Sequence, residues 1–296
     1  MWRTIACAVL IGACGGGGSV MPDAPNTACK DMGGSACFQL PTAPLQTHDG
    51  APSALGCGPV VPGTSSAVVT YTGNVAAYGA NTPIPGALIK VHTAPDFANP
   101  VSTATSAADA TYSLPIPSGT PELMWNSVEA SGFLTSYVHA YRPDLMHGDI
   151  ASFNLRLFIP DNLESAALLV KEVWDPAFTV VAGYAYDCNR MIIVHAAVAL
   201  SSTSGQRTFV PGASLYYGAP GVVPLAVPPD ERGDTNDNGV FAVFRVPPGQ
   251  QLFIQIWGFV DAAAQARGEA GLTLVGEWPV HAVANSVVVA NVWVNK

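Results

Sequence analysis

The chain has 296 residues, of which 49% are hydrophobic and 11% charged, with a formal net charge of −9. It contains 12 Lys and Arg without a basic cluster, so it lacks the positive patch that nucleic-acid binding requires. The 25 prolines and 29 glycines predict frequent turns, and this composition favours an all-β fold over a helical one.

Residues 1–13 predict export. Arg3 precedes an uncharged apolar run from Thr4 to Ala13, which is shorter than the roughly 20 residues needed to span a bilayer. A basic start followed by a short apolar run is typical of a secretory signal peptide, which we assign to residues 1–13.

The run ends at Ile11-Gly12-Ala13-Cys14, which resembles a bacterial lipobox. The resemblance implies that Cys14 receives lipid, palmitate included, and that this lipid attaches the protein to a membrane. Gly15 stands where an aspartate would retain a lipoprotein in the inner membrane, so the resemblance implies the outer membrane of a Gram-negative bacterium. The alternative is an ordinary signal peptide with an incidental cysteine.

Residues 14–66 are rich in Gly, Pro, Ser and Thr, and we interpret them as a tether followed by a cysteine-containing linker. An oxidising compartment favours disulfides, and the cysteines beyond Cys14 allow three pairings. We prefer a pairing of Cys29 with Cys37 and of Cys57 with Cys188. None of these cysteines forms a CxxC pair, which argues against zinc.

Two units, residues 67–160 and 177–296, share a succession of motifs. Gly73 and Ala87 of the first unit have the same spacing as Gly183 and Ala197 of the second. Short runs with β-branched and aromatic residues alternate with turn residues, which predicts an antiparallel β-sandwich for each unit. The further matches are Tyr112 with Phe241, Gly119 with Gly249, and the strand-like run FNLRLFI at 153–159 with SVVVANVWV at 286–294.

Residues 161–176 predict a short connecting helix and loop. Asp161 and Glu164 have the spacing of a capping box, and good helix formers follow them. Pro176 prevents the helix from continuing. The second unit also contains an insert, in which Ala213–Tyr217 predicts an additional strand.

The order of the motifs resembles carboxypeptidase-regulatory-like domains, which are transthyretin-like sandwiches of Greek-key type. The resemblance rests on PIPGALIKV and ATYSLPIPSG in the first unit and on AYDCNRMIIVHAAVAL and TNDNGVFAVFRVPPG in the second. The first unit departs from the family at Ala110, where a turn glycine is usual. The resemblance implies two tandem antiparallel sandwiches, and it brings no catalytic residues or cofactors with it.

The stretch DTNDNG at 234–239 reads like the first half of a calcium loop. Such a loop needs a bidentate glutamate at its twelfth position, where this chain has the cation Arg245. Asn238-Gly239 is a strong hairpin signal, so we interpret the stretch as a structural turn. The alternative is surface calcium binding by Asp234, Asn236 and Asn238.

Nucleophile, phosphate-binding and dinucleotide motifs are absent from the sequence, so we expect no catalysis and no cofactor. His139 and His147, with Asp144 between them and Asp149 directly after, form the best alternative site, for a hydrolase with an unfamiliar centre. Aromatic side chains that could stack on sugars are Trp125, Tyr137 and Tyr141 in the first unit and Tyr216, Tyr217 and Trp257 in the second.

These observations predict a non-catalytic, lipid-anchored envelope protein that acts as a surface or periplasmic interaction module. Its expected partners are the membrane, through its lipid, and an envelope protein or glycan. The first alternative is a carbohydrate-binding module, which requires an exposed row of aromatic rings. The second is the hydrolase described above.

Overall fold

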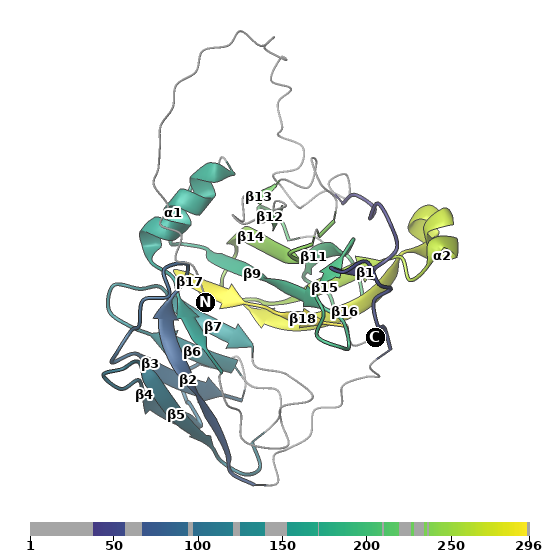
Figure 1. Cartoon of the computed structure of the whole chain (residues 1–296). Helices are drawn as coiled ribbons and strands as arrows, with labels where there is room; N and C mark the ends of the chain where they lie inside the picture. The colour runs from purple at the N-terminus through teal and green to yellow at the C-terminus, as the bar shows by residue number, and fades with distance from the viewer. Residues whose placement is uncertain are drawn as a thin grey trace, which may run out of the picture.

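Strand β5 (Thr111–Ile116) shows how the sequence pattern produces the fold, because its residues are alternately exposed and buried. Tyr112, Leu114 and Ile116 face the core, since successive side chains of a strand point to opposite faces of its sheet. The result is an all-β fold whose described part includes two short α-helices (Figure 1). The computed structural model describes residues 38–56, 67–93, 97–120, 125–139, 153–170, 172–208, 210–218, 226–227, 234–235 and 237–294.

The first sandwich consists of two packed sheets. One has the order β5–β2–β8, in which β2 (Val69–Ala77) is antiparallel to β5 and parallel to β8 (Leu155–Leu157). The other has the order β4–β3–β6–β7 and is antiparallel throughout. Its strands are β3 (Leu88–His92), β4 (Ser102–Thr105), β6 (Trp125–Glu129) and β7 (Thr135–His139).

The second sandwich also has two layers. One has the order β11–β15–β16, and the other the order β13–β12–β14–β9. Strand β12 confirms the strand predicted in the insert, and it pairs with β14. Helix α2 (Ala262–Ala266) and the 3-10 turn η2 (Gly268–Gly271) connect β15 to β16. The strands are β9 (Thr179–Tyr186), β11 (Ala197–Ser201), β12 (Ser214–Gly218), β13 (Ala226–Val227), β14 (Val240–Val246), β15 (Gln251–Gly258) and β16 (Thr273–His281).

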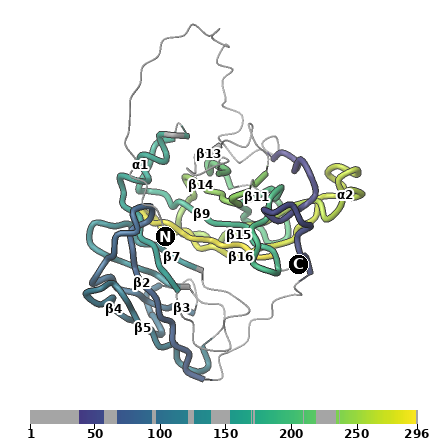
Figure 2. Tube along the Cα trace, in the orientation of Figure 1, coloured from purple at the N-terminus to yellow at the C-terminus, as the bar shows by residue number. Residues whose placement is uncertain are grey.

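Strand β17 (Ser286–Val289) joins the two sandwiches. It runs parallel to β7 of the first and to β9 of the second, with Val288 opposite both Tyr137 and Val181. A single ten-stranded sheet therefore crosses from one sandwich to the other. The yellow C-terminal segment can be followed between β9 and β7 in Figure 2. The run at 286–294, which the sequence analysis assigns to the second unit, thus also supplies a strand to a sheet of the first unit.

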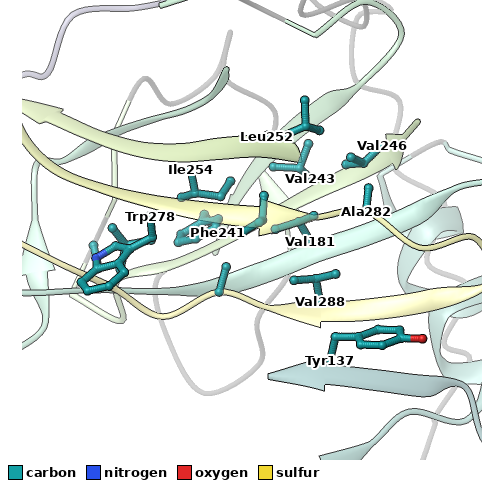
Figure 3. Packing of buried hydrophobic residues seen from close by; sticks show 14 of the residues in the cluster. Tyr137, Val181, Phe241, Val243, Val246, Leu252, Ile254, Trp278, Ala282 and Val288 are labelled. Carbon is teal, nitrogen blue, oxygen red and sulfur yellow. The ribbon is translucent and has the colours of Figure 1, made fainter. Parts of the chain in front are cut away.

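Both faces of β17 are covered. Val288 packs in the cluster that contains Phe241 and Ile254 of the second sandwich, and Tyr137 of β7 lies beside it (Figure 3). Val287 points to the opposite face and belongs to a second cluster, with Leu163 of helix α1. Because both valines are fully buried, β17 contributes apolar contacts on each side of the shared sheet.

The registers of the first strand pairs support the internal repeat. Gly73 of β2 lies opposite Tyr112, and Gly183 of β9 lies opposite Phe241, the same residues that the motifs align. A Cβ on Gly73 would lie 2.3 Å from the carbonyl oxygen of Phe153, and a Cβ on Gly183 would lie 1.9 Å from that of Ala290. Both glycines therefore let a later segment cross directly over the strand.

The turns before β5 and β14 are also equivalent. Ala110 has a φ of 65° and Gly239 a φ of 62°, so both adopt the left-handed conformation. The first unit keeps the turn although it lacks the expected glycine, and alanine in this region costs roughly 1–2 kcal/mol.

Helix α1 (Pro160–Leu169) is shorter than the predicted connecting segment 161–176. The predicted capping box is wrong: Ile159 is the N-cap, no side chain caps the helix, and Pro160 occupies its first turn. Proline suits this place because it has no N–H group that would need a partner there. Leu163 and Ala167 pack on Val180 and Val287, so the helix covers one face of the shared sheet.

Residues 38–56 pack on the second sandwich, although the sequence places them in the linker before the first. Strand β1 (Gln46–Thr47) pairs with β10 (Ile193–Val194), and Leu45 is buried. The Leu45 side chain occupies the space that a Cβ on Gly258 would fill. The short strand β18 (Val292–Trp293) pairs in parallel with the end of β9.

Candidate functional site

The stretch 234–239 divides into two structural roles. Asp234 is 2% exposed, and its Oδ2 accepts hydrogen bonds from the backbone N–H and the hydroxyl of Thr42, both at 2.8 Å. Asn238 Oδ1 accepts the N–H of Val240 at 3.1 Å, which stabilises a local turn before β14. Of the predicted calcium ligands, Asn236 lies outside the described residues, and the other two form these bonds.

His195 completes a small polar cluster around Asp234. Its Nδ1 lies 3.4 Å from Asp234 Oδ2 and 3.1 Å from Thr42 Oγ1. A hydroxyl, an imidazole and a carboxylate also form the catalytic triad of hydrolases, but there the imidazole uses one nitrogen for the carboxylate and the other for the hydroxyl. Here both contacts involve Nδ1, and the Thr42 hydroxyl donates directly to Asp234. The arrangement clamps the N-terminal segment to the second sandwich.

The charge of Asp234 is favoured by this cluster. Burial raises the pKa of its carboxyl, but the hydrogen bonds from His195 and Thr42 outweigh burial and lower the pKa below the ordinary value of 3.8. The clamp therefore adds stability above that value, and this contribution is lost as the pH falls through the lowered pKa. Sequence reasoning missed the clamp because Thr42 and Asp234 are 192 positions apart.

We expect Asp234→Asn to lower the free energy of unfolding at pH 7 by about 1–3 kcal/mol, because Thr42 and His195 lose a charged acceptor. The difference from the unsubstituted protein should shrink as the pH falls through the lowered pKa of Asp234, because the carboxyl is then protonated. Denaturant unfolding at pH 7 and over a series of acidic pH values measures this. Asp237→Asn, at an exposed position of the same stretch, is the control. A loss that is equal in both variants, or that persists in acid, contradicts the clamp.

A second polar cluster surrounds Glu277, which is 8% exposed. Its carboxylate accepts hydrogen bonds from the Ser204 hydroxyl and the Gly205 N–H at 2.6 Å, and from Gln255 Nε2 at 2.7 Å. Gln255 Nε2 also contacts the carbonyl oxygens of Thr203 and Gln206. The carboxylate thus holds the loop after β11 against β15 and β16.

Arg207 fixes the same loop from outside. Its guanidinium lies 4.1 Å from the ring centroid of Phe38 and 5.2 Å from that of Trp257. It also forms an ion pair with Glu269, with 2.7 Å between Nη2 and Oε1. These contacts attach the start of the described chain, at Phe38, to the second sandwich.

Only part of the predicted histidine site lies within the residues that the structure describes. His139 ends strand β7, but its side chain and all of His147 lie outside the described residues, so a site there stays a prediction. Within the described ranges, no three His, Cys, Asp or Glu side chains are grouped so that they could hold a metal ion.

Three of the six aromatic residues predicted to stack on sugars are core residues instead. Tyr137, Tyr216 and Tyr217 are buried, and Trp257 is half-buried. The side chain of Trp125 and all of Tyr141 lie outside the described residues. The burial of the three tyrosines follows from the sandwich packing, in which bulky rings fill the space between layers.

A different set of rings forms what we term the aromatic strip: Tyr78, Phe158, Tyr184, Tyr186 and Trp293. Tyr78 stacks on Phe158 with 4.5 Å between ring centroids, and Tyr186 stacks on Trp293 with 4.7 Å. Tyr184 lies beside the second of these stacks. Its ring centroid lies 5.9 Å from that of Tyr186, and burial, followed by the neighbouring phenols of Tyr78 and Tyr186, raises its pKa.

The strand pairing explains the strip. Tyr184 and Tyr186 alternate along β9 with Gly183 and Ala185, which face the core, so the tyrosines point outward. Trp293 of β18 lies opposite Tyr186. The spacing of the two tyrosines is visible in the sequence, but no sequence signal connects them to Tyr78 or Trp293.

The predicted lipidation site Cys14 lies outside the described residues, as do Cys29, Cys37 and Cys57. The backbone N–H of Cys188 donates to the carbonyl oxygen of Ala54, which precedes Cys57 by three positions in the sequence, at 3.1 Å. The pairing of Cys57 with Cys188 stays a prediction. In the part of the chain that the structure describes, no helix is long and apolar enough to cross a membrane.

No protein-family model matches the sequence, and no curated protein matches it. The solved structures to which the chain is similar include the shaft pilin SpaA from Lactobacillus rhamnosus GG, at 9% identity and a TM-score of 0.23, over 79% of this chain and 99% of the pilin. They also include GBS52, the minor pilin of Streptococcus agalactiae, at 9% identity and a TM-score of 0.23, over 77% and 96% of the two chains. Likeness at this level carries no argument about function, and the resemblance to carboxypeptidase-regulatory-like domains stays a prediction.

Proposed function

We propose that the chain is an exported, non-catalytic module, attached by lipid at Cys14 to the outer membrane of a Gram-negative bacterium, where it binds another envelope component. The observation that carries this proposal is the union of the two sandwiches into one body by β17. A rigid body of this kind suits a protein that presents a surface at a fixed orientation.

The two polar clusters support the non-catalytic part of this proposal, because their carboxylates hold parts of the fold together. The carboxylates of Asp234 and Glu277 accept hydrogen bonds from elements of their own fold. A general base needs a lone pair that can reach a substrate proton. Both carboxylates are instead engaged in attaching loops and the N-terminal segment.

The docking of residues 38–56 also shortens the proposed tether. The lipidated Cys14 would be connected to Phe38, which contacts Arg207 of the second sandwich. Fully extended, residues 14–38 span at most about 80 Å. The second sandwich, rather than the first, would then be the part attached nearest to the membrane.

We expect Cys14→Ser to abolish metabolic labelling with a palmitate analogue and to release the protein from the membrane fraction, because serine cannot form the thioether. Labelling and fractionation of cells that produce either form measure this. Cys188→Ser is the control, since it replaces another cysteine without touching the proposed anchor. Continued labelling of the Cys14→Ser protein would show that the lipobox interpretation is wrong.

The interaction function is tested with the full chain that carries Cys14→Ser, immobilised and exposed to solubilised envelope material. We expect a protein or a glycan to be retained in a saturable manner. The same chain unfolded and immobilised serves as the control for non-specific adsorption. Envelope material that is not retained above this control contradicts the proposed function.

A further inference from the structure

The aromatic strip spans the junction between the sandwiches. Tyr78 follows β2 and Phe158 follows β8 in the first sandwich, whereas Tyr184, Tyr186 and Trp293 belong to β9 and β18 of the second. Ring contacts join Tyr78 to Phe158, and they join Tyr186 to both Tyr184 and Trp293. The phenol of Tyr78 is also close enough to that of Tyr184 to raise its pKa. The strip exists only because the two sandwiches are held in one orientation.

The rings are both accessible and supported. Tyr78 is 40% exposed and stacks on Phe158, which is only 8% exposed. The buried ring of Phe158 thus supports the exposed ring of Tyr78. Tyr184, Tyr186 and Trp293 are half-buried, so each keeps part of its surface at the solvent. Rings that are already held in place lose little conformational entropy when a ligand binds.

The chemistry of the strip selects among ligands. None of its residues is charged, and the chain as a whole carries a net charge of −9, which disfavours nucleic acids and other polyanions. The phenol of Tyr184, whose pKa burial and its neighbouring phenols raise, stays protonated at neutral pH and can donate a hydrogen bond. The strip therefore offers apolar ring faces with hydroxyl groups at their edges.

Sugar rings have the complementary arrangement, with C–H groups on their faces and hydroxyls around their edges. A stable protein interface commonly buries about 800 Å² and about 20–30 residues on each partner, whereas the strip consists of a few rings. An extended polysaccharide presents its sugar rings one after another, so a few aromatic side chains can bind it. We propose that the aromatic strip binds a neutral polysaccharide chain whose sugars stack along Tyr78, Tyr186 and Trp293. This inference rests on the proposed interaction function and names the class of its ligand.

The test uses the full chain with Cys14→Ser and three insoluble neutral polysaccharides, cellulose, chitin and mannan, in sedimentation assays. Binding is then quantified by calorimetry with soluble oligosaccharides of the retained type. We expect at least one polysaccharide to be retained. Tyr78→Ala and Trp293→Ala should each weaken binding about tenfold, which corresponds to 1.4 kcal/mol. Tyr78→Phe, which keeps the ring, should bind within about twofold of the unsubstituted chain.

Leu168→Ala is the matched control, because Leu168 is 71% exposed and lies on helix α1, outside the strip. Circular dichroism verifies that each variant is folded. The inference is overturned if no neutral polysaccharide is retained, or if the alanine variants of the strip bind as tightly as the control. Retention of an envelope protein that depends on the strip would overturn the glycan inference and leave the interaction function standing. If no envelope material were retained and no neutral polysaccharide bound, both the glycan inference and the proposed interaction function would be contradicted.

Discussion

Val288→Asp is expected to destabilise both sandwiches at once, by about 4 kcal/mol or more. Val288 is fully buried in the middle of β17, between Tyr137 of one sandwich and Val181 of the other. A carboxylate there would be buried without a partner, or would have to be protonated, and either costs free energy. Since a domain is commonly stable by about 5–15 kcal/mol, the loss is a large fraction of the total.

Denaturant unfolding with hydrogen exchange measures the effect separately in each sandwich. Exchange should become faster both in β6 of the first sandwich and in β15 of the second, because β17 bonds to a strand of each. Val173→Asp is the control: Val173 is 76% exposed, so the same substitution should change stability by no more than about 0.5 kcal/mol. Faster exchange in the second sandwich alone would show that the two fold independently.

Gly183→Ala should cost about 3 kcal/mol, at the upper end of the range for overpacked sites. The new methyl group would lie 1.9 Å from the carbonyl oxygen of Ala290, a backbone atom that cannot rotate away. Either β9 or the segment between β17 and β18 must shift, and all three strands belong to the shared sheet. Thermal unfolding of the variant measures the loss, and Gly73→Ala, where Phe153 takes the place of Ala290, should behave in the same way.

Gly218→Ala is the matched control for this prediction. Its added Cβ would lie 2.7 Å from Asn238 Oδ1, which belongs to a side chain that can rotate. The expected loss is therefore smaller, about 1 kcal/mol. If all three alanine variants were equally stable, the close backbone crossings at Gly73 and Gly183 would not matter to the fold.

The internal repeat was readable in the sequence because it depends on local requirements. Positions 73 and 183 require a residue without a side chain, and the positions of Tyr112 and Phe241 require a large ring that can be buried, whatever surrounds each unit. The turn at Ala110 shows the limit of such reading. The chain adopts a left-handed φ there without glycine, because the strands on both sides fix the turn.

The candidate site was less predictable. Tyr216 and Tyr217, proposed to stack on sugars, fill cores on opposite faces of β12. No motif in the sequence marks Tyr78 or Trp293 as a binding residue. Exposure of a ring depends on which strands pair and on what covers them, and residue type does not encode either. The same holds for Asp234, whose partner Thr42 comes from a segment that resembles a linker.

Alternation, turn chemistry and steric limits act over a few residues, so the all-β class, the two repeated units and the turn at Asn238-Gly239 can be inferred from the amino-acid sequence. The shared use of β17, the return of residues 38–56 to the second sandwich and the grouping of five rings in the aromatic strip emerge from the folded chain alone. These features depend on pairings between distant segments. Many strands of similar composition could satisfy such pairings, and the packing of the whole chain selects among them.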